Sequence, residues 1–76
     1  MKKIDEIRDR VLADQIVYLE NEYEQIALKV IPKPESIEYR AKFRGGQEYD
    51  IKGSSQVVVE AWMQPKEITE QEYENY

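Results

Sequence analysis

Residues 37–51 read IEYRAKFRGGQEYDI, and this stretch decides the fold. Apolar and charged side chains alternate before and after Gly45-Gly46, as they do in two strands that each bury one face and expose the other. A three-residue loop would place Phe43 opposite Tyr49 and keep the apolar side chains on one face, whereas a two-residue turn would mix the faces. The stretch therefore predicts an antiparallel hairpin with one apolar side.

The same two-residue period continues on both sides of the hairpin. Upstream, residues alternate until Pro32, which has no N–H to donate to a β-ladder, and the same logic places Val30 opposite Ile37. Downstream, the last strand is indicated by an apolar row that consists of Val57, Val59, Ala61 and Met63. These segments predict a four-stranded antiparallel meander, with strands at about 26–31, 36–44, 48–52 and 56–63.

The first part of the chain follows a helical period instead. Apolar side chains between residues 4 and 23 fall within about half of a helical wheel, while charged side chains lie mostly on the other half. We expect an amphipathic helix at about 3–22, packed across the apolar face of the sheet. The apolar half consists of Ile4, Ile7, Val11, Leu12, Ile16, Tyr18, Leu19 and Tyr23.

A second, shorter helix is predicted near the end of the sequence. Thr69 and Glu72 have the spacing of a capping box, and Tyr73 is placed to close a hydrophobic staple. A helix at about 70–75 follows, and it is either docked through Tyr73 and Tyr76 or frayed until a partner orders it.

The predicted fold class is α+β. At 76 residues the chain is expected to form a single small domain, residues 1–76, with two layers. The N-terminal amphipathic helix packs on the four-stranded antiparallel β-meander, and the short acidic helix follows it.

The composition excludes much of enzyme chemistry. The chain has no His and no Cys, so the usual general base, the thiolate nucleophile and most transition-metal ligands are missing. We expect no enzymatic activity, no cofactor, no metal and no small-molecule substrate. No apolar run approaches the roughly 20 residues that cross a bilayer, and no signal-peptide core follows the N-terminal residues. The expected location is therefore the cytoplasm, away from membranes.

Acidic side chains gather at both ends of a chain whose net charge is −5. Charge runs are usually solvated faces, but converging acidic ends would form a negative surface that fits a basic groove on another protein. Trp62 is either buried under the C-terminal segment, turned inward by a bulge, or exposed as an interface anchor. The predicted partner-binding residues are Trp62, Glu60, Glu67, Glu70, Glu72, Glu74, Tyr73 and Tyr76.

Arg40, Lys42 and Arg44 form a row on the polar side of one predicted strand. The row is either a phosphate-tracking stripe for nucleic acid or a solvated face matched across strands by carboxylates such as Glu48 and Asp50. Cross-strand pairing is favoured because such pairs are common in antiparallel sheets.

The leading hypothesis for function is a non-enzymatic protein–protein interaction module. A chain this small and acidic is similar in broad character to the inhibitors that phages and mobile elements use against host nucleases, some of which mimic DNA. The similarity covers size and charge, and no motif carries it. It implies a protein partner with a basic nucleic-acid-binding groove, bound by a monomer or homodimer. Two alternatives remain: a structural subunit that homo-oligomerises through its last strand or helix, and a weak nucleic-acid binder that uses Arg40, Lys42 and Arg44.

Overall fold

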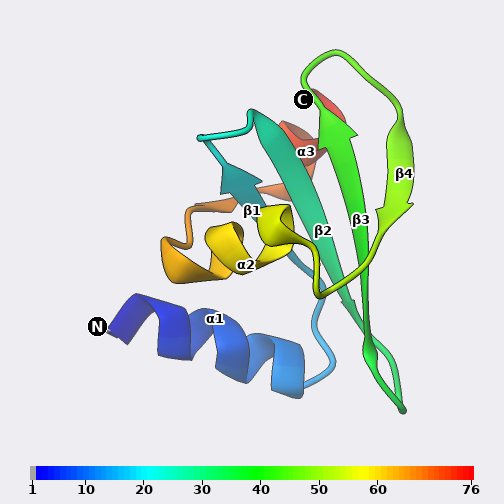
Figure 1. Ribbon diagram of the computed structural model, residues 1–76. Coiled ribbons are helices and arrows are strands. Elements are labelled where there is room, and N and C mark those ends of the chain that lie inside the picture. Colours follow the sequence, from blue (N-terminus) through cyan, green and yellow to red (C-terminus); the bar gives the residue numbers. More distant parts are fainter. Residues whose placement is uncertain (1) are drawn as a thin grey trace.

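The computed structural model describes the backbone of residues 2–76 and the side chains of residues 5–76 (Figure 1). The sheet has the strand order β4-β3-β2-β1-β5 with antiparallel neighbours, so β1 to β4 form a meander and β5 is added beside β1. The predicted α+β class, with an N-terminal helix, an antiparallel meander and a short C-terminal helix, is confirmed. The elements are α1 (Lys2–Leu12), β1 (Val17–Asn21), β2 (Ile26–Pro32), β3 (Ile37–Phe43), β4 (Glu48–Ile51), α2 (Gln56–Met63), β5 (Glu67–Ile68) and α3 (Glu70–Glu74).

The predicted helix at 3–22 is wrong in its second half, because α1 ends at Leu12. Asp14 adopts a left-handed conformation with φ 65°, and the N–H of Gln15 donates to the carbonyl of Arg10 at 2.9 Å. This six-to-one bond is the mark of a Schellman helix end, and Asp tolerates the left-handed conformation better than most residues. Residues 17–21 then form β1, in which Leu19 pairs with Leu28.

The predicted strand at 56–63 is wrong throughout, because these residues form α2. Valine costs a helix only roughly 0.5–0.7 kcal/mol per residue relative to alanine, and burial of apolar area outweighs that cost. Val58 and Ala61, three residues apart, are buried on the side of α2 that faces the sheet, while Val59 and Met63 are exposed. As a helix, this segment packs on one face of the sheet instead of adding a further strand to it.

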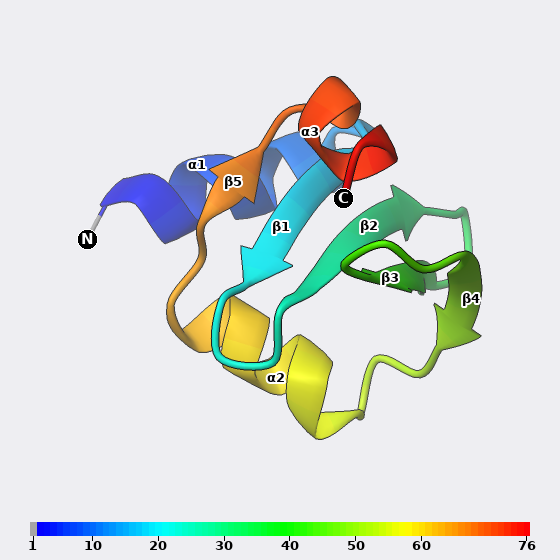
Figure 2. The same ribbon diagram turned by 90° about the horizontal axis from the view of Figure 1, so that it is seen from above.

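Helices cover both faces of the sheet. On one face, α1 and α2 pack on the inward side chains of β1 and β2 in a single core cluster, which includes Ile7 and Leu19. On the other face, the ring of Tyr18 lies 5.1 Å from that of Tyr73 in α3, between ring centroids. Figure 2 shows α2 and α3 on opposite sides of the strands. The helix that carries Asp5, Glu6 and Asp9 and the acidic α3 therefore lie on different faces, so the acidic side chains at the two ends of the chain do not converge.

The predicted strand registers are wrong by two residues. Ala41, not Phe43, pairs with Tyr49, and Tyr39, not Ile37, pairs with Val30. A shift of two residues keeps every side chain on its face, so the hydrophobic pattern cannot detect it. Phe43 and Tyr49 still stack diagonally, with ring centroids 5.6 Å apart.

Candidate protein-binding surface

The acidic C-terminal segment is docked on the sheet and is not a free tail. The predicted capping box is confirmed: the N–H of Glu72 donates to Oγ1 of Thr69 at 3.1 Å, and the N–H of Thr69 donates to Oε1 of Glu72 at 2.8 Å. Tyr73 is only 2% exposed, and its hydroxyl donates to Oε2 of Glu48 at 2.7 Å. Tyr76 is also buried. Both tyrosines therefore anchor the segment to its own sheet.

Burial and the neighbouring Glu48 carboxylate both act on Tyr73. Burial, the larger effect, raises the pKa of the Tyr73 hydroxyl, and its hydrogen bond to Glu48 and the charge of that carboxylate raise the pKa further. The phenol therefore stays protonated and remains a hydrogen-bond donor at any ordinary pH.

Glu20 on β1 joins three distant parts of the chain. Its carboxylate accepts hydrogen bonds from the hydroxyl of Tyr76 at 2.9 Å and from Arg44 at 3.4 Å, and Nζ of Lys66 lies 3.2 Å away. Partial burial is the largest effect and raises the pKa of Glu20, but the hydrogen bonds from Tyr76 and Lys66 and the charges of Lys66 and Arg44 outweigh it. The net pKa of Glu20 is lowered, so the carboxylate is held in its charged form.

The basic row on β3 is engaged within the molecule. Nε of Arg40 lies 2.8 Å from Asp50, its partner across the strands. Nζ of Lys42 donates to the carbonyl of Glu74 at 2.8 Å, and the Arg44 guanidinium lies 4.3 Å from the ring centroid of Tyr76. Two of the three cations that could track a phosphate backbone are thus bound to the C-terminal segment.

Another cation of the molecule is also paired. Arg10 of α1 donates two hydrogen bonds to Glu67 of β5, one of them at 2.6 Å, and this carboxylate raises the pKa of the guanidinium. By contrast, neither Glu70 nor Glu74 forms an ion pair with a described lysine or arginine. Together with Glu72 they are exposed on α3. Negative charge therefore remains on α3 although Lys42 and Arg44 contact the C-terminal segment.

Trp62 is a packing residue in this structure. It is half-buried against the main core cluster, and its Nε1 donates to the hydroxyl of Tyr39 at 3.2 Å. The predicted site residues are thus divided: Glu70, Glu72 and Glu74 are exposed on α3, Glu67 is engaged with Arg10, and Glu60 lies elsewhere, on α2.

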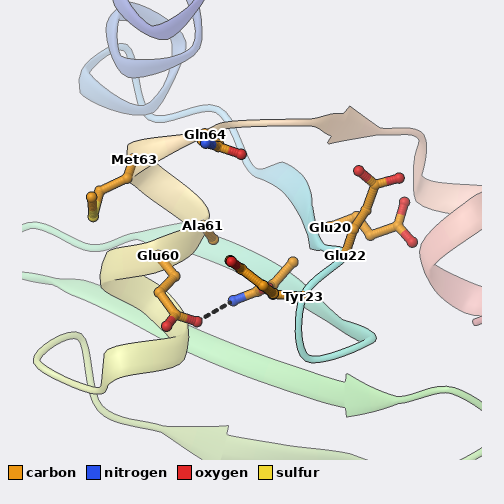
Figure 3. A pocket seen from close by; sticks show the side chains of 8 residues that line it. Glu20, Glu22, Tyr23, Glu60, Ala61, Met63 and Gln64 are labelled. Carbon is orange, nitrogen blue, oxygen red and sulfur yellow. Dashed lines mark hydrogen bonds between the residues drawn. The ribbon is translucent and has the colours of Figure 1, made fainter.

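A pocket between α2 and the β1–β2 turn was missed by the sequence analysis (Figure 3). Tyr23 is 89% exposed and Met63 74% exposed at this pocket, although both had been assigned to apolar faces of a helix and a strand. In the predicted secondary structure both side chains point into the core, so the sequence did not indicate a pocket at this place. The lining residues are Glu20, Asn21, Glu22, Tyr23, Glu60, Ala61, Met63 and Gln64.

Comparison with known protein families, with curated proteins and with solved structures finds no match to this chain. Within the described residues, no helix has the length and apolar character needed to cross a bilayer. No group of three or more acidic side chains in that part of the chain is arranged to hold a metal ion. The geometry of the surface alone therefore guides a proposal for function.

Proposed function

We propose that this protein is a non-enzymatic binding module that presents an acidic surface to a basic surface of another protein. We call this surface the α3 carboxylates, Glu70, Glu72 and Glu74. The observation that carries the proposal is the contrast between engaged cations and free carboxylates. Lys42 and Arg44 are bound by the C-terminal segment, while Glu70 and Glu74 have no described basic partner.

The docking of α3 supports this proposal energetically. Tyr73 and Tyr76 hold the segment on the sheet, so a partner would not have to order it, and the ordering cost of binding is reduced. An acidic surface on a preformed element also steers a basic partner during encounter and suppresses anionic competitors. A basic groove that normally holds nucleic acid is the kind of partner that fits this charge.

The test compares three versions of the chain in a pull-down from lysate of the source organism, or of its host if the protein is phage-borne, with partners identified by mass spectrometry. One variant carries Glu70→Gln, Glu72→Gln and Glu74→Gln, and glutamine at position 72 can still complete the capping box. The control neutralises Asp5, Glu6 and Asp9 on α1, an equal charge change on the opposite face of the sheet.

We expect wild type and the α1 control to capture the same basic, nucleic-acid-handling protein, and the α3 variant to lose it. The purified pair should then bind less tightly as salt is raised, because exposed charges are screened. Equal capture by all three versions, or no capture by any, argues against the proposal.

Self-association is a second candidate function, favoured by the exposed edge of the sheet at β4. Within the described residues this strand pairs with β3 alone, and its Tyr49 stacks on Phe43 of β3 with both rings partly open to solvent. Pairing through residues 56–63 is no longer available, because that segment is a helix. Sedimentation velocity over a range of protein concentrations tests the candidate: a constant monomer mass argues against it, and a Tyr49→Glu variant should dissociate any oligomer built on this edge.

A further inference from the structure

We infer that the pocket between α2 and the β1–β2 turn receives one lysine or arginine side chain from a basic segment of the partner protein. We call it the Glu60 pocket, with the eight lining residues named above. The inference rests on the proposed function, because it names the group that a basic partner would insert. It places that group on α2 and the β1–β2 turn, away from the α3 carboxylates.

The Glu60 carboxylate is held in place by two uncharged donors. Nδ2 of Asn21 donates to its Oε1 at 3.2 Å (dashed line in Figure 3), and Nε2 of Gln56 donates to its Oε2 at 3.0 Å. Among the described side chains, no lysine or arginine pairs with Glu60. Because each carboxylate oxygen can accept a further hydrogen bond, a guanidinium or an ammonium group can still bind here.

Asn21 makes this orientation rigid. Its side chain is 4% exposed, its Nδ2 also donates to the carbonyl of Val57 at 3.0 Å, and its Oδ1 accepts from the N–H of Glu24 at 3.1 Å. These bonds tie the end of β1 to α2 and to the following turn. The carboxylate of Glu60 is therefore preorganised rather than free to rotate into solvent.

The walls of the pocket suit the aliphatic stem of a basic side chain. Ala61 of α2 is buried on the side of this helix that faces the sheet. The side chains of Tyr23 and Met63 are largely exposed at the pocket. Lysine and arginine cover such apolar surface with their methylene groups while the charged head stays with polar partners. The exposed ring of Tyr23 also offers a face to a cation.

The size of the pocket selects a single side chain. Its volume is about 120 Å³, well below the roughly 300–1,000 Å³ of pockets that hold whole small ligands. A cofactor does not fit in this volume.

The charge around the pocket selects a cation. Glu20 and Glu22 also line it, and both already bind the Lys66 ammonium, at 3.2 Å and 2.6 Å. The charge of these two carboxylates is thus compensated by a cation of the same chain, whereas Glu60 has no basic partner among the described side chains. An anionic segment, including the acidic surface of a second copy of this chain, is disfavoured by the Glu60 carboxylate.

The experiment titrates the ¹⁵N-labelled full chain at low salt with hexa-arginine, and in parallel with hexa-citrulline as an uncharged peptide of the same shape. Affinities are measured for wild type, Glu60→Gln, Tyr23→Ala and the control Glu35→Gln, which removes the same charge from the exposed β2–β3 loop, and Glu74→Gln reports separately on the α3 carboxylates. Spectra of the free variants check that each is folded. Tyr23→Ala removes a ring that is almost fully exposed, so this variant still tests the pocket if Glu60→Gln disturbs the fold.

We expect hexa-arginine to perturb amide signals at residues 20–24 and 60–64 and to bind Glu60→Gln roughly tenfold more weakly, the size expected for one charge-assisted hydrogen-bonded contact. Tyr23→Ala should weaken binding severalfold, Glu35→Gln less than twofold, and hexa-citrulline should not bind.

Each of the following results would overturn the inference that the Glu60 pocket binds a lysine or arginine side chain. Equal losses in Glu60→Gln and Glu74→Gln, with perturbations centred on α3, would assign binding to the α3 carboxylates and leave the proposed function standing. Equal binding of hexa-citrulline removes the requirement for a cation. Concentration-dependent shifts at the pocket without peptide identify a second copy as the occupant. Absence of binding by either peptide also overturns the pocket, whereas the proposed function is decided separately by the α3 pull-down.

Discussion

The hydroxyl of Tyr76 donates a hydrogen bond of 2.9 Å to Oε2 of Glu20, across 56 positions of the sequence. The same carboxylate interacts with Arg44, whose guanidinium lies over the Tyr76 ring. The backbone oxygen of Tyr76 also accepts from the N–H of Gly45 at 2.6 Å. Side-chain and backbone bonds thus fasten the last turn of the chain to β1 and to the β3–β4 loop, and the α3 carboxylates are presented on a fixed support.

Substitution of Tyr76 by phenylalanine should lower the free energy of unfolding by about 1–3 kcal/mol. The ring still packs on the sheet, but the Glu20 carboxylate, whose side chain is largely buried, loses a donor, and leaving such a group short of partners is costly. Urea denaturation measures the effect. Tyr23→Phe, which removes a hydroxyl from a side chain that is 89% exposed, serves as the control and should change stability by less than about 0.5 kcal/mol. Equal effects of the two substitutions would show that the Glu20 contact contributes nothing.

Stability should fall in acid partly through Glu20. Because the pKa of Glu20 is lower in the folded state, its contribution is present above the unfolded value of about 4.3 and is lost as pH falls through the folded value. Glu20→Gln should be less stable than wild type by about 1–3 kcal/mol at pH 7, and the difference should shrink toward pH 3. Denaturant titrations at a series of pH values measure this difference. Glu70→Gln, an exposed carboxylate on α3, should track wild type throughout, and a pH-independent gap for Glu20→Gln would contradict the assigned linkage.

The sequence was sufficient to predict the strands at β2, β3 and β4 and the capping box at Thr69, because each carries its own local signal. Alternation decides which side chains face the core, and the spacing of Thr69 and Glu72 decides where α3 begins. These features depend on neighbours within a few positions. The strands and the helix start are therefore predicted correctly even where the packing of the rest of the chain is not.

The two wrong elements depended on tertiary packing instead. In residues 17–21, Leu19 fits a strand as well as a helix face, and the helix ends earlier, where Asp14 adopts a left-handed conformation. In residues 56–63, three valines favour a strand, but burial of Val58 against the sheet favours a helix. The Glu60 pocket lies between these two segments, so it is not expected from a sequence pattern that assigns the first to a helix and the second to a strand.

Two leucines test the corrected end of α1. Leu19 is fully buried on β1, whereas Leu12, at the last position of α1, is 72% exposed. Leu19→Ala should lower the free energy of unfolding by about 2–5 kcal/mol through lost burial and a residual cavity. Leu12→Ala should change it by less than about 0.5 kcal/mol. Thermal and urea unfolding measure both. Similar losses for the two leucines would indicate a continuous helix with both side chains in its apolar face.

Alkaline unfolding should depend on Tyr73. Its pKa is raised in the folded protein, first by burial and then by the hydrogen bond to Glu48, so the folded state retains a proton that the unfolded chain releases near pH 10. The stabilising contribution of Tyr73 is therefore complete below pH 10 and declines as pH rises beyond it. Tyr73→Phe should be about 1 kcal/mol less stable than wild type at pH 8, and this gap should close or reverse above pH 10 because phenylalanine cannot ionise. Unfolding followed by circular dichroism from pH 8 to 11 measures the gap, with Tyr23→Phe as the exposed control. A gap that stays constant over this range would mean that the Tyr73 hydroxyl ionises equally in the folded and unfolded chains, and would place α3 away from the sheet in solution.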